Sequence, residues 1–419
     1  MRRATVIALL FFALLFCATT AQAALSNVVY QLGFGARGLA LGSAYTALGG
    51  DASTAFFNPA AMAALEHSEI MLSYVYAAPN FTGGPVGDTF TYDTPNQDIQ
   101  ANMALKLNSL FKSNFPLALG LNVALDENGA GFIRFYDVQH PEGYYYMYGP
   151  SSFTLNGSLG FGLTDWLFLG GGVVTVLHGP SDFYVTTDLG GRTSKEGLNL
   201  ESDTIIAPVA AAFLHFTPVD VGLTYHGKTV GSLGPVKVNA TATVGDSPLT
   251  KLPMDLFYKD SYCPHRVGLG AHWRILDNFN TVGDVVWYNW KNFTDEMSTG
   301  DLPRKDKPFE FKDTFVPHIG FEYEPLEHFD LRVGYGYQET PVVDPGDSSN
   351  VILDNTKHII SAGLGYTWQN PPLLAYPITF DGAYFMHYLM HRDITTVDSA
   401  EYESSGTLNG GALSITLRY

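Results

Sequence analysis

Short stretches in which large apolar residues alternate with small or polar ones recur along most of the chain. In residues 117–125 the odd positions are leucine or valine, and the even positions are alanine, glycine or asparagine. Residues 153–161, 267–274 and 331–338 alternate in the same way. Successive side chains of a strand point to opposite faces, so each stretch predicts a strand with one apolar face. Both a transmembrane β-barrel and a soluble β-sandwich contain such strands.

The lengths of the connections favour the barrel. The pattern predicts fourteen strands, at residues 68–78, 100–109, 116–125, 152–162, 167–178, 204–216, 219–228, 264–275, 280–291, 314–325, 328–338, 357–368, 377–388 and 408–419. Short turns such as residues 217–218 and 326–327 alternate with long polar connections such as residues 79–99, 126–151 and 229–263. Outer-membrane barrels combine short periplasmic turns with long outer loops. We therefore predict an all-β fold, an antiparallel transmembrane barrel over residues 68–419.

The first residues are typical of an exported protein. Two arginines precede an apolar run at residues 4–15, and Ala21-Gln22-Ala23 provides the small residues that a signal peptidase recognises. We predict a signal peptide over residues 1–23 and an outer-membrane location. No later stretch reaches the 18 consecutive apolar residues that a membrane helix requires.

Residues 24–67 do not alternate, and they are too many for a simple tail. Six glycines between positions 33 and 50 indicate a tightly turning path. Asn58 followed by Pro59 is a typical helix start, with a capping side chain and proline at the first helical position. We predict that residues 24–67 form a hatch, a plug folded inside the barrel.

Composition and charge exclude several classes of function. Only 15% of the residues are charged and the net charge is −18, so nucleic acid is not an expected partner. The chain has two cysteines, of which Cys17 lies in the predicted signal peptide, so no disulfide framework is expected.

The sequence contains no convincing catalytic or cofactor motif. Residues 33–38 match G-x-G-x-x-G, but the strand, helix and acidic residue of a dinucleotide site are missing around them. The twelve histidines are scattered, and no Ser/His/Asp group has a signature spacing. We therefore expect no enzymatic activity, no metal and no cofactor.

Some polar and aromatic residues are candidates for a ligand path. Alternation places Arg266 and Arg332 on the lumen face, where they either contact a passing ligand or belong to an ion-pair network that anchors the hatch. Tyr144, Tyr145 and Tyr146 lie in a long connection and form either an apolar capture surface or part of an interfacial aromatic girdle.

Several short motifs, in order along the chain, resemble one known family. Residues 35–60, which include Asn58-Pro59-Ala60, resemble the hatch of the FadL/TodX outer-membrane transporters of long-chain fatty acids and aromatic hydrocarbons. The resemblance continues in LTYHGK at residues 223–228, in VWYNWKNF at 286–293, and in KDT followed by LRVGY at 312–314 and 331–335.

The resemblance implies a function and a set of gating residues. It implies a monomeric channel in outer-membrane lipid and lipopolysaccharide that takes up hydrophobic small molecules passively. Asn58, Pro59 and Ala60 would be hatch residues. The ligand would leave sideways beside a kink in the third strand, for which Gly120 is the candidate because glycine weakens and bends strands.

A second hypothesis belongs to a different class. Related PorV-type barrels act as docking or scaffold components in protein secretion or surface attachment, and long outer loops suit either role. The connection after Lys228 is longer and richer in proline than the family pattern, so the substrate stays open at this point.

Overall fold

The computed structural model describes most of the chain after residue 31. The described ranges are residues 32–93, 95–108, 115–126, 130–134, 144–148, 152–178, 181–188, 193–200, 205–244, 247–292, 310–343, 353–372, 374–396 and 399–419. The predicted signal peptide and residues 24–31 lie outside these ranges. Among the described residues, no helix has the length and hydropathy needed to cross a membrane.

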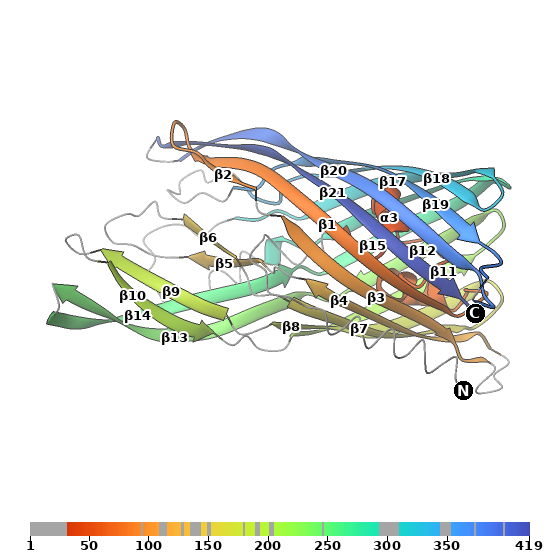
Figure 1. Cartoon of the computed structure of the whole chain (residues 1–419), viewed down its shortest axis with the longest axis horizontal. Coiled ribbons are helices and arrows are strands. Elements are labelled where there is room, and N and C mark those ends of the chain that lie inside the picture. Colours follow the sequence, from red (N-terminus) through yellow and green to blue (C-terminus); the bar gives the residue numbers. More distant parts are fainter. Residues whose placement is uncertain are drawn as a thin grey trace.

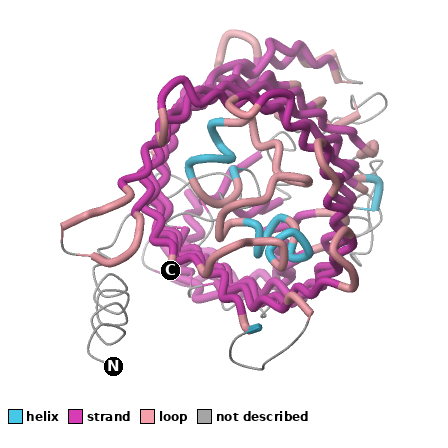
Figure 2. Tube along the Cα trace, turned by 90° about the vertical axis from the view of Figure 1, so that its right-hand side faces the viewer, coloured by secondary structure: helices cyan, strands magenta, loops and turns pink. Residues whose placement is uncertain are grey.

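The strands form one closed antiparallel barrel (Figures 1 and 2). Fourteen strands make the wall: β1 (Glu69–Pro85), β3 (Asn96–Lys106), β4 (Leu117–Asp126), β7 (Ser152–Gly162), β8 (Leu167–His178), β11 (Ile205–His215), β12 (Val219–His226), β15 (Arg266–Leu276), β16 (Phe279–Tyr288), β17 (Thr314–Leu326), β18 (Phe329–Gln338), β19 (Lys357–Trp368), β20 (Ile378–Thr395) and β21 (Glu401–Arg418). Because β1 pairs with both β3 and β21, the described wall has no open edge. The predicted fold is confirmed, and each predicted strand corresponds to one wall strand, but β1, β20 and β21 continue into the connections that we predicted as loops.

The connections that we expected to be polar loops contain further strands. They are β2 (Phe90–Tyr92), β5 (Ala130–Arg134), β6 (Tyr144–Tyr148), β9 (Ser181–Asp188), β10 (Thr193–Leu200), β13 (Thr229–Val244) and β14 (Ser247–Cys263). The β9–β10 and β13–β14 hairpins project from the end of the barrel opposite the C-terminus (Figure 1). The prediction that these connections are loops is therefore wrong for these residues.

The two faces of the wall differ as predicted. On β15 the outward side chains of Leu269 and Trp273 are exposed, whereas the inward positions Gly268 and Gly270 are buried. The outward face of β18 and β21 is also apolar, with Val333 and Leu413 exposed. An apolar outer band on a closed barrel suits a lipid environment.

The described residues that precede β1 lie inside the ring of strands (Figure 2). Residues 32–67, called the inner segment below, contain three short helices: α3 (Ala36–Ala40), α4 (Thr54–Phe57) and α5 (Pro59–Met62). Helix α3 packs on β18–β21, whereas α5 packs on β7, β8 and β11. The inner segment therefore crosses the lumen from one side of the wall to the other.

Candidate functional site in the barrel lumen

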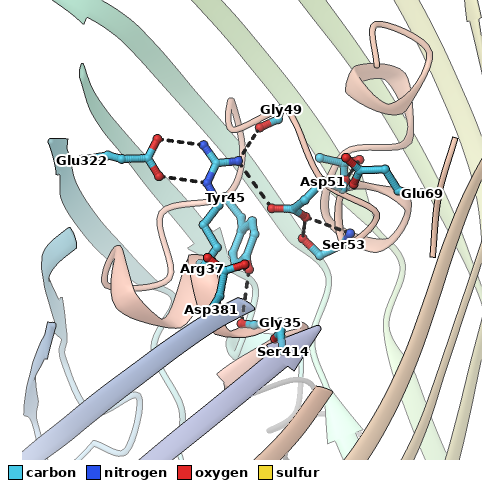
Figure 3. Close-up of polar contacts among 12 residues, drawn as sticks. Gly35, Arg37, Tyr45, Gly49, Asp51, Ser53, Glu69, Glu322, Asp381 and Ser414 are labelled. Atoms are coloured by element: carbon cyan, nitrogen blue, oxygen red, sulfur yellow. Dashed lines mark hydrogen bonds and ion pairs between the residues drawn. The ribbon is translucent and has the colours of Figure 1, made fainter. Parts of the chain in front are cut away.

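An ion-pair cluster holds the first turn of the inner segment against β17 and β18. Arg37 of α3 donates to both carboxylate oxygens of Glu322, with both N···O distances 3.0 Å (Figure 3). Arg332 donates from Nε to the same Glu322 carboxylate at 2.5 Å and from Nη1 to Asp381 at 2.6 Å. The Glu322 carboxylate of the wall thus accepts hydrogen bonds from one arginine of the inner segment and from one arginine of the wall.

Arg37 also has partners within its own segment. Its Nη1 donates to the Gly49 carbonyl at 2.9 Å and lies 3.5 Å from Asp51 Oδ2 (Figure 3). Burial alone lowers the pKa of Arg37, but the neighbouring carboxylates of Glu322 and Asp51 outweigh it and raise that pKa well above its usual value. The guanidinium therefore stays charged although it is buried.

Two further wall residues hold the turn that follows α3. Asp284 of β16 accepts from the backbone N–H groups of Tyr45 and Thr46, each at 3.0 Å. Ser361 of β19 accepts from the Gly42 N–H and donates to the Ala40 carbonyl, each at 3.0 Å. We call the inner face of β16–β20 the charged wall. Its contacts are directional, so they fix the inner segment in one position.

Buried amides hold the segment on the opposite side. Asn156 donates to Asn122 at 2.8 Å, and Asn122 donates to Asn102 at 2.7 Å, across three neighbouring strands. The Nδ2 groups of the same two donors reach the carbonyls of Ala55 at 2.9 Å and Ala52 at 3.3 Å. We call the inner face of β3, β4 and β7 the amide wall. It satisfies backbone groups of the inner segment that are shielded from solvent.

Strand β3 of the amide wall also binds the start of the inner segment. Gln100 accepts from the Gly35 N–H and donates to the Gly33 carbonyl, both at 2.9 Å. Its Nε2 also donates to Asp98 at 2.7 Å. A single amide side chain thereby binds one backbone N–H and one backbone carbonyl of the same turn, as the backbone of a neighbouring strand would.

A third sector of the lumen is apolar. Val174, Val176, Ile205 and Val209 point inward from β8 and β11, and each is at most 6% exposed. They form a cluster with Phe34 and Phe56 of the inner segment, together with Ala124 of β4 and the partly buried Phe57. We call the inner face of β8 and β11 the apolar wall. We expected small or polar lumen residues, and here the structure differs, because both faces of these strands are apolar.

Glycines let the segment approach the wall closely. A Cβ at Gly334 would lie 2.0 Å from the Gly42 nitrogen, and one at Gly170 would lie 2.4 Å from the Ala60 nitrogen. Both distances are too short for any side chain. The wall therefore contacts the backbone of the inner segment directly.

The three predicted hatch residues lie together in the lumen. The Asn58 side chain accepts from the N–H groups of Ala60 at 3.1 Å and Ala61 at 3.3 Å, so it caps α5, and Pro59 is the first residue of that helix. The Asn58 Nδ2 also donates to the Thr46 carbonyl at 2.7 Å, a bond that the sequence did not indicate. Ala60 is fully buried.

Gly120 contributes space rather than a break in pairing. Strand β4 pairs with β3 and β7 through Gly120 without a register shift. A Cβ at Gly120 would lie 2.4 Å from Ala55 Cβ and 2.7 Å from Met62 Sδ. The glycine leaves room for the inner segment.

The ligand-path candidates do not form one cluster. Arg332 belongs to the ion-pair cluster of the charged wall. Arg266 lies on β15, where its guanidinium stacks over the Phe56 ring at 5.4 Å and approaches His226 Nδ1 at 3.2 Å. Tyr144, Tyr145 and Tyr146 are in β6, which pairs with β5, and their side chains lie outside the described part of the structure.

Sequence reasoning missed Arg37 and Gln100 as lumen residues. Arg37 sits inside the G-x-G-x-x-G stretch that we rejected as a cofactor motif, and its partner is 285 positions away. A lone arginine among small residues was the available signal. Gln100 was at the edge of a predicted strand, where neither face can be assigned from alternation alone.

Comparison with known proteins gives consistent matches. A family model described as "Outer membrane protein transport protein (OMPP1/FadL/TodX)" matches residues 219–411. Alkane uptake protein A from Marinobacter nauticus is 25% identical over 400 residues, which cover 88% of this chain and 86% of that protein.

Solved structures share the fold. A FadL homologue from Pseudomonas aeruginosa superimposes with a TM-score of 0.67 at 16% identity, covering 96% of this chain and 99% of that one. The toluene transporter TodX from P. putida gives a TM-score of 0.58 at 14% identity, with 93% and 99% covered.

Proposed function

This chain is related to the FadL/TodX family of outer-membrane transport proteins, and from that premise we propose that it is a channel for passive uptake of hydrophobic small molecules. Hydrocarbons and long-chain fatty acids are the substrate classes that we propose. Apolar solutes cross a polar lipopolysaccharide layer slowly, and a protein route through the outer membrane removes that barrier. Diffusion down a gradient requires neither a cofactor nor an energy source.

The observation that carries this proposal is the apolar wall. The lumen of a general porin is polar and filled with water. Here Val174, Val176 and Val209 face the lumen and are buried against aromatic rings of the inner segment. Such a surface favours an apolar cargo over a hydrated one, because transfer of apolar area from water is favourable.

We assign the inner segment the role of a hatch. It lies within the ring of strands and is held by contacts to all three walls, so passage requires it to move (Figure 2). Asn58, Pro59 and Ala60 hold its second half in shape, and Gly120 accommodates it. Tyr144, Tyr145 and Tyr146 are proposed as an outer capture surface, and Arg266 as a residue that the ligand passes.

The proposed setting is a monomer in the outer membrane, exported through a cleaved signal peptide and surrounded by lipid and lipopolysaccharide. The scaffold alternative receives no support from the matches described above, which include a family of transport proteins, an alkane uptake protein and a toluene transporter. Co-purification of this chain with a secretion complex at defined stoichiometry would revive it.

Uptake by whole cells tests the proposal. The chain is expressed in a Gram-negative strain that lacks its own hydrophobic-compound channel, and entry of labelled hexadecane, toluene and oleate is measured. We expect entry of at least one of them above the vector control, without an increase in entry of a sugar. Entry at the vector level, with correctly inserted protein shown by a heat-dependent gel shift, would contradict the proposal.

A further inference from the structure

We propose that the inner segment undocks from the wall as one body, because its charged and amide anchors on the wall each keep a second partner there. This inference rests on the proposed role of the segment as a hatch. The anchoring pairs on the wall are Glu322 with Arg332 at 2.5 Å, Asp284 with His318 at 2.7 Å, Gln100 with Asp98 at 2.7 Å, Asn156 with Asn122 at 2.8 Å, and Asn122 with Asn102 at 2.7 Å.

Two side chains in the first half of the inner segment also have partners within the segment. Arg37 keeps the Gly49 carbonyl and Asp51 when it leaves Glu322 (Figure 3). The Tyr45 hydroxyl donates to the Phe34 carbonyl at 2.6 Å and accepts from the Gly38 N–H at 2.7 Å. These contacts link residues on both sides of α3, so the first half of the segment keeps its shape without the wall.

This double pairing changes the cost of separation. A buried ion pair is normally expensive to break, since each partner becomes an uncompensated charge in a poorly solvated place. Separation of Arg37 from Glu322 leaves Arg37 with Asp51, and Glu322 with Arg332. Ser361 and Ser158 anchor backbone carbonyls of the segment as well, and these neutral hydroxyls can bond water after separation.

The pairing predicts opposite effects for the two arginines that share Glu322. Arg37→Met removes the contact between segment and wall but leaves Glu322 paired with Arg332, so undocking becomes easier. Arg332→Met leaves Arg37 as the cation nearest to both Glu322 and Asp381. Undocking would then leave two buried carboxylates without a cation, so it becomes harder. If Arg332 only stabilised the fold, both substitutions would loosen the segment.

Accessibility of a cysteine in the segment measures undocking directly. Ala44 is fully buried, so Ala44→Cys in a Cys263→Ser background reports opening through its rate of reaction with a membrane-impermeant maleimide in proteoliposomes. We expect Arg37→Met to raise this rate about tenfold and Arg332→Met to lower it. The matched control is Arg274→Met, another wall arginine, which pairs with Asp220 instead.

Equal signs for Arg37→Met and Arg332→Met would overturn the proposal. If Arg332→Met does not insert into the membrane, His318→Phe replaces it, because it removes the wall partner of Asp284 and should also lower the rate. Hydrocarbon uptake is measured on the same variants. If the two substitutions change the labelling rate in opposite directions but no variant takes up hydrocarbon, the undocking is retained and the transport function is rejected. If hydrocarbon is taken up but both substitutions change the labelling rate in the same direction, the transport function is retained and the undocking is rejected.

Discussion

The charged wall and the apolar wall hold the same segment by different physics. On the charged wall, Glu322, Asp284 and Ser361 bind particular groups at fixed distances. On the apolar wall, Val174 and Ile205 contact the Phe34 and Phe56 rings without directional bonds. Directional contacts specify one position, while an apolar surface accepts any apolar partner of suitable size. The charged wall therefore places the segment, and the apolar wall is where a hydrocarbon could replace its aromatic rings.

The largest expected effect comes from removing the segment from both walls. Deletion of residues 24–57 should raise single-channel conductance for small ions by about tenfold or more, because a wide barrel without its contents is open to water. Planar-bilayer recordings of the deletion variant and the full chain measure this. Unchanged conductance would mean that the segment does not occlude the lumen.

A smaller effect is expected from a substitution that weakens docking of the inner segment on the charged wall alone. Gly334→Ala places a methyl group 2.0 Å from the Gly42 nitrogen, so it should disfavour docking by about 1–3 kcal/mol and speed maleimide labelling of Ala44→Cys. Gly157→Ala is the matched control, because a Cβ there meets no atom within 4 Å. Similar labelling of the two variants would show that close backbone contact does not hold the segment.

The apolar wall can be tested by a single hydroxyl. Val174→Thr should lower hydrocarbon uptake about fivefold, since a buried hydroxyl without a partner costs roughly 1 kcal/mol or more. The neighbouring Val173 points outward and is 49% exposed, so Val173→Thr controls for the loss of a valine on the same strand. Equal uptake by the two variants would remove the apolar wall from the ligand path.

The smallest effect is expected at the cap of α5. Asn58→Ala removes the bonds to Ala60, Ala61 and Thr46, with a cost of about 0.5–2 kcal/mol for a lost cap. Folding and insertion should persist, while uptake of a labelled fatty acid or alkylbenzene should change at equal surface level. A Pro59→Ala, Ala60→Trp double variant serves as comparison, and unchanged uptake in both would exclude this motif from gating.

The alternation of residues determined the wall of this protein. Period-two patterns, together with the spacing of turns, located the barrel strands and gave their antiparallel order, because sheet pairing between sequence neighbours is a local property. The lumen-facing positions of Arg266 and Arg332 followed from the same alternation. Asn58 as a cap could also be read locally, since its partners are two and three residues away.

Only the tertiary structure decided which residues of the inner segment contact which residues of the wall. Arg37 and Glu322 are 285 positions apart, and Ala36 and Ser414 are 378 apart. Alternation assigns a residue to the lumen face, but it gives neither the position of that residue along the barrel axis nor its neighbour across the barrel. The apolar wall was hidden for a related reason, because strands that are apolar on both faces lose the alternation that tells the faces apart. Where closure of the ring brings distant strands together, the contacts depend on the whole chain at once.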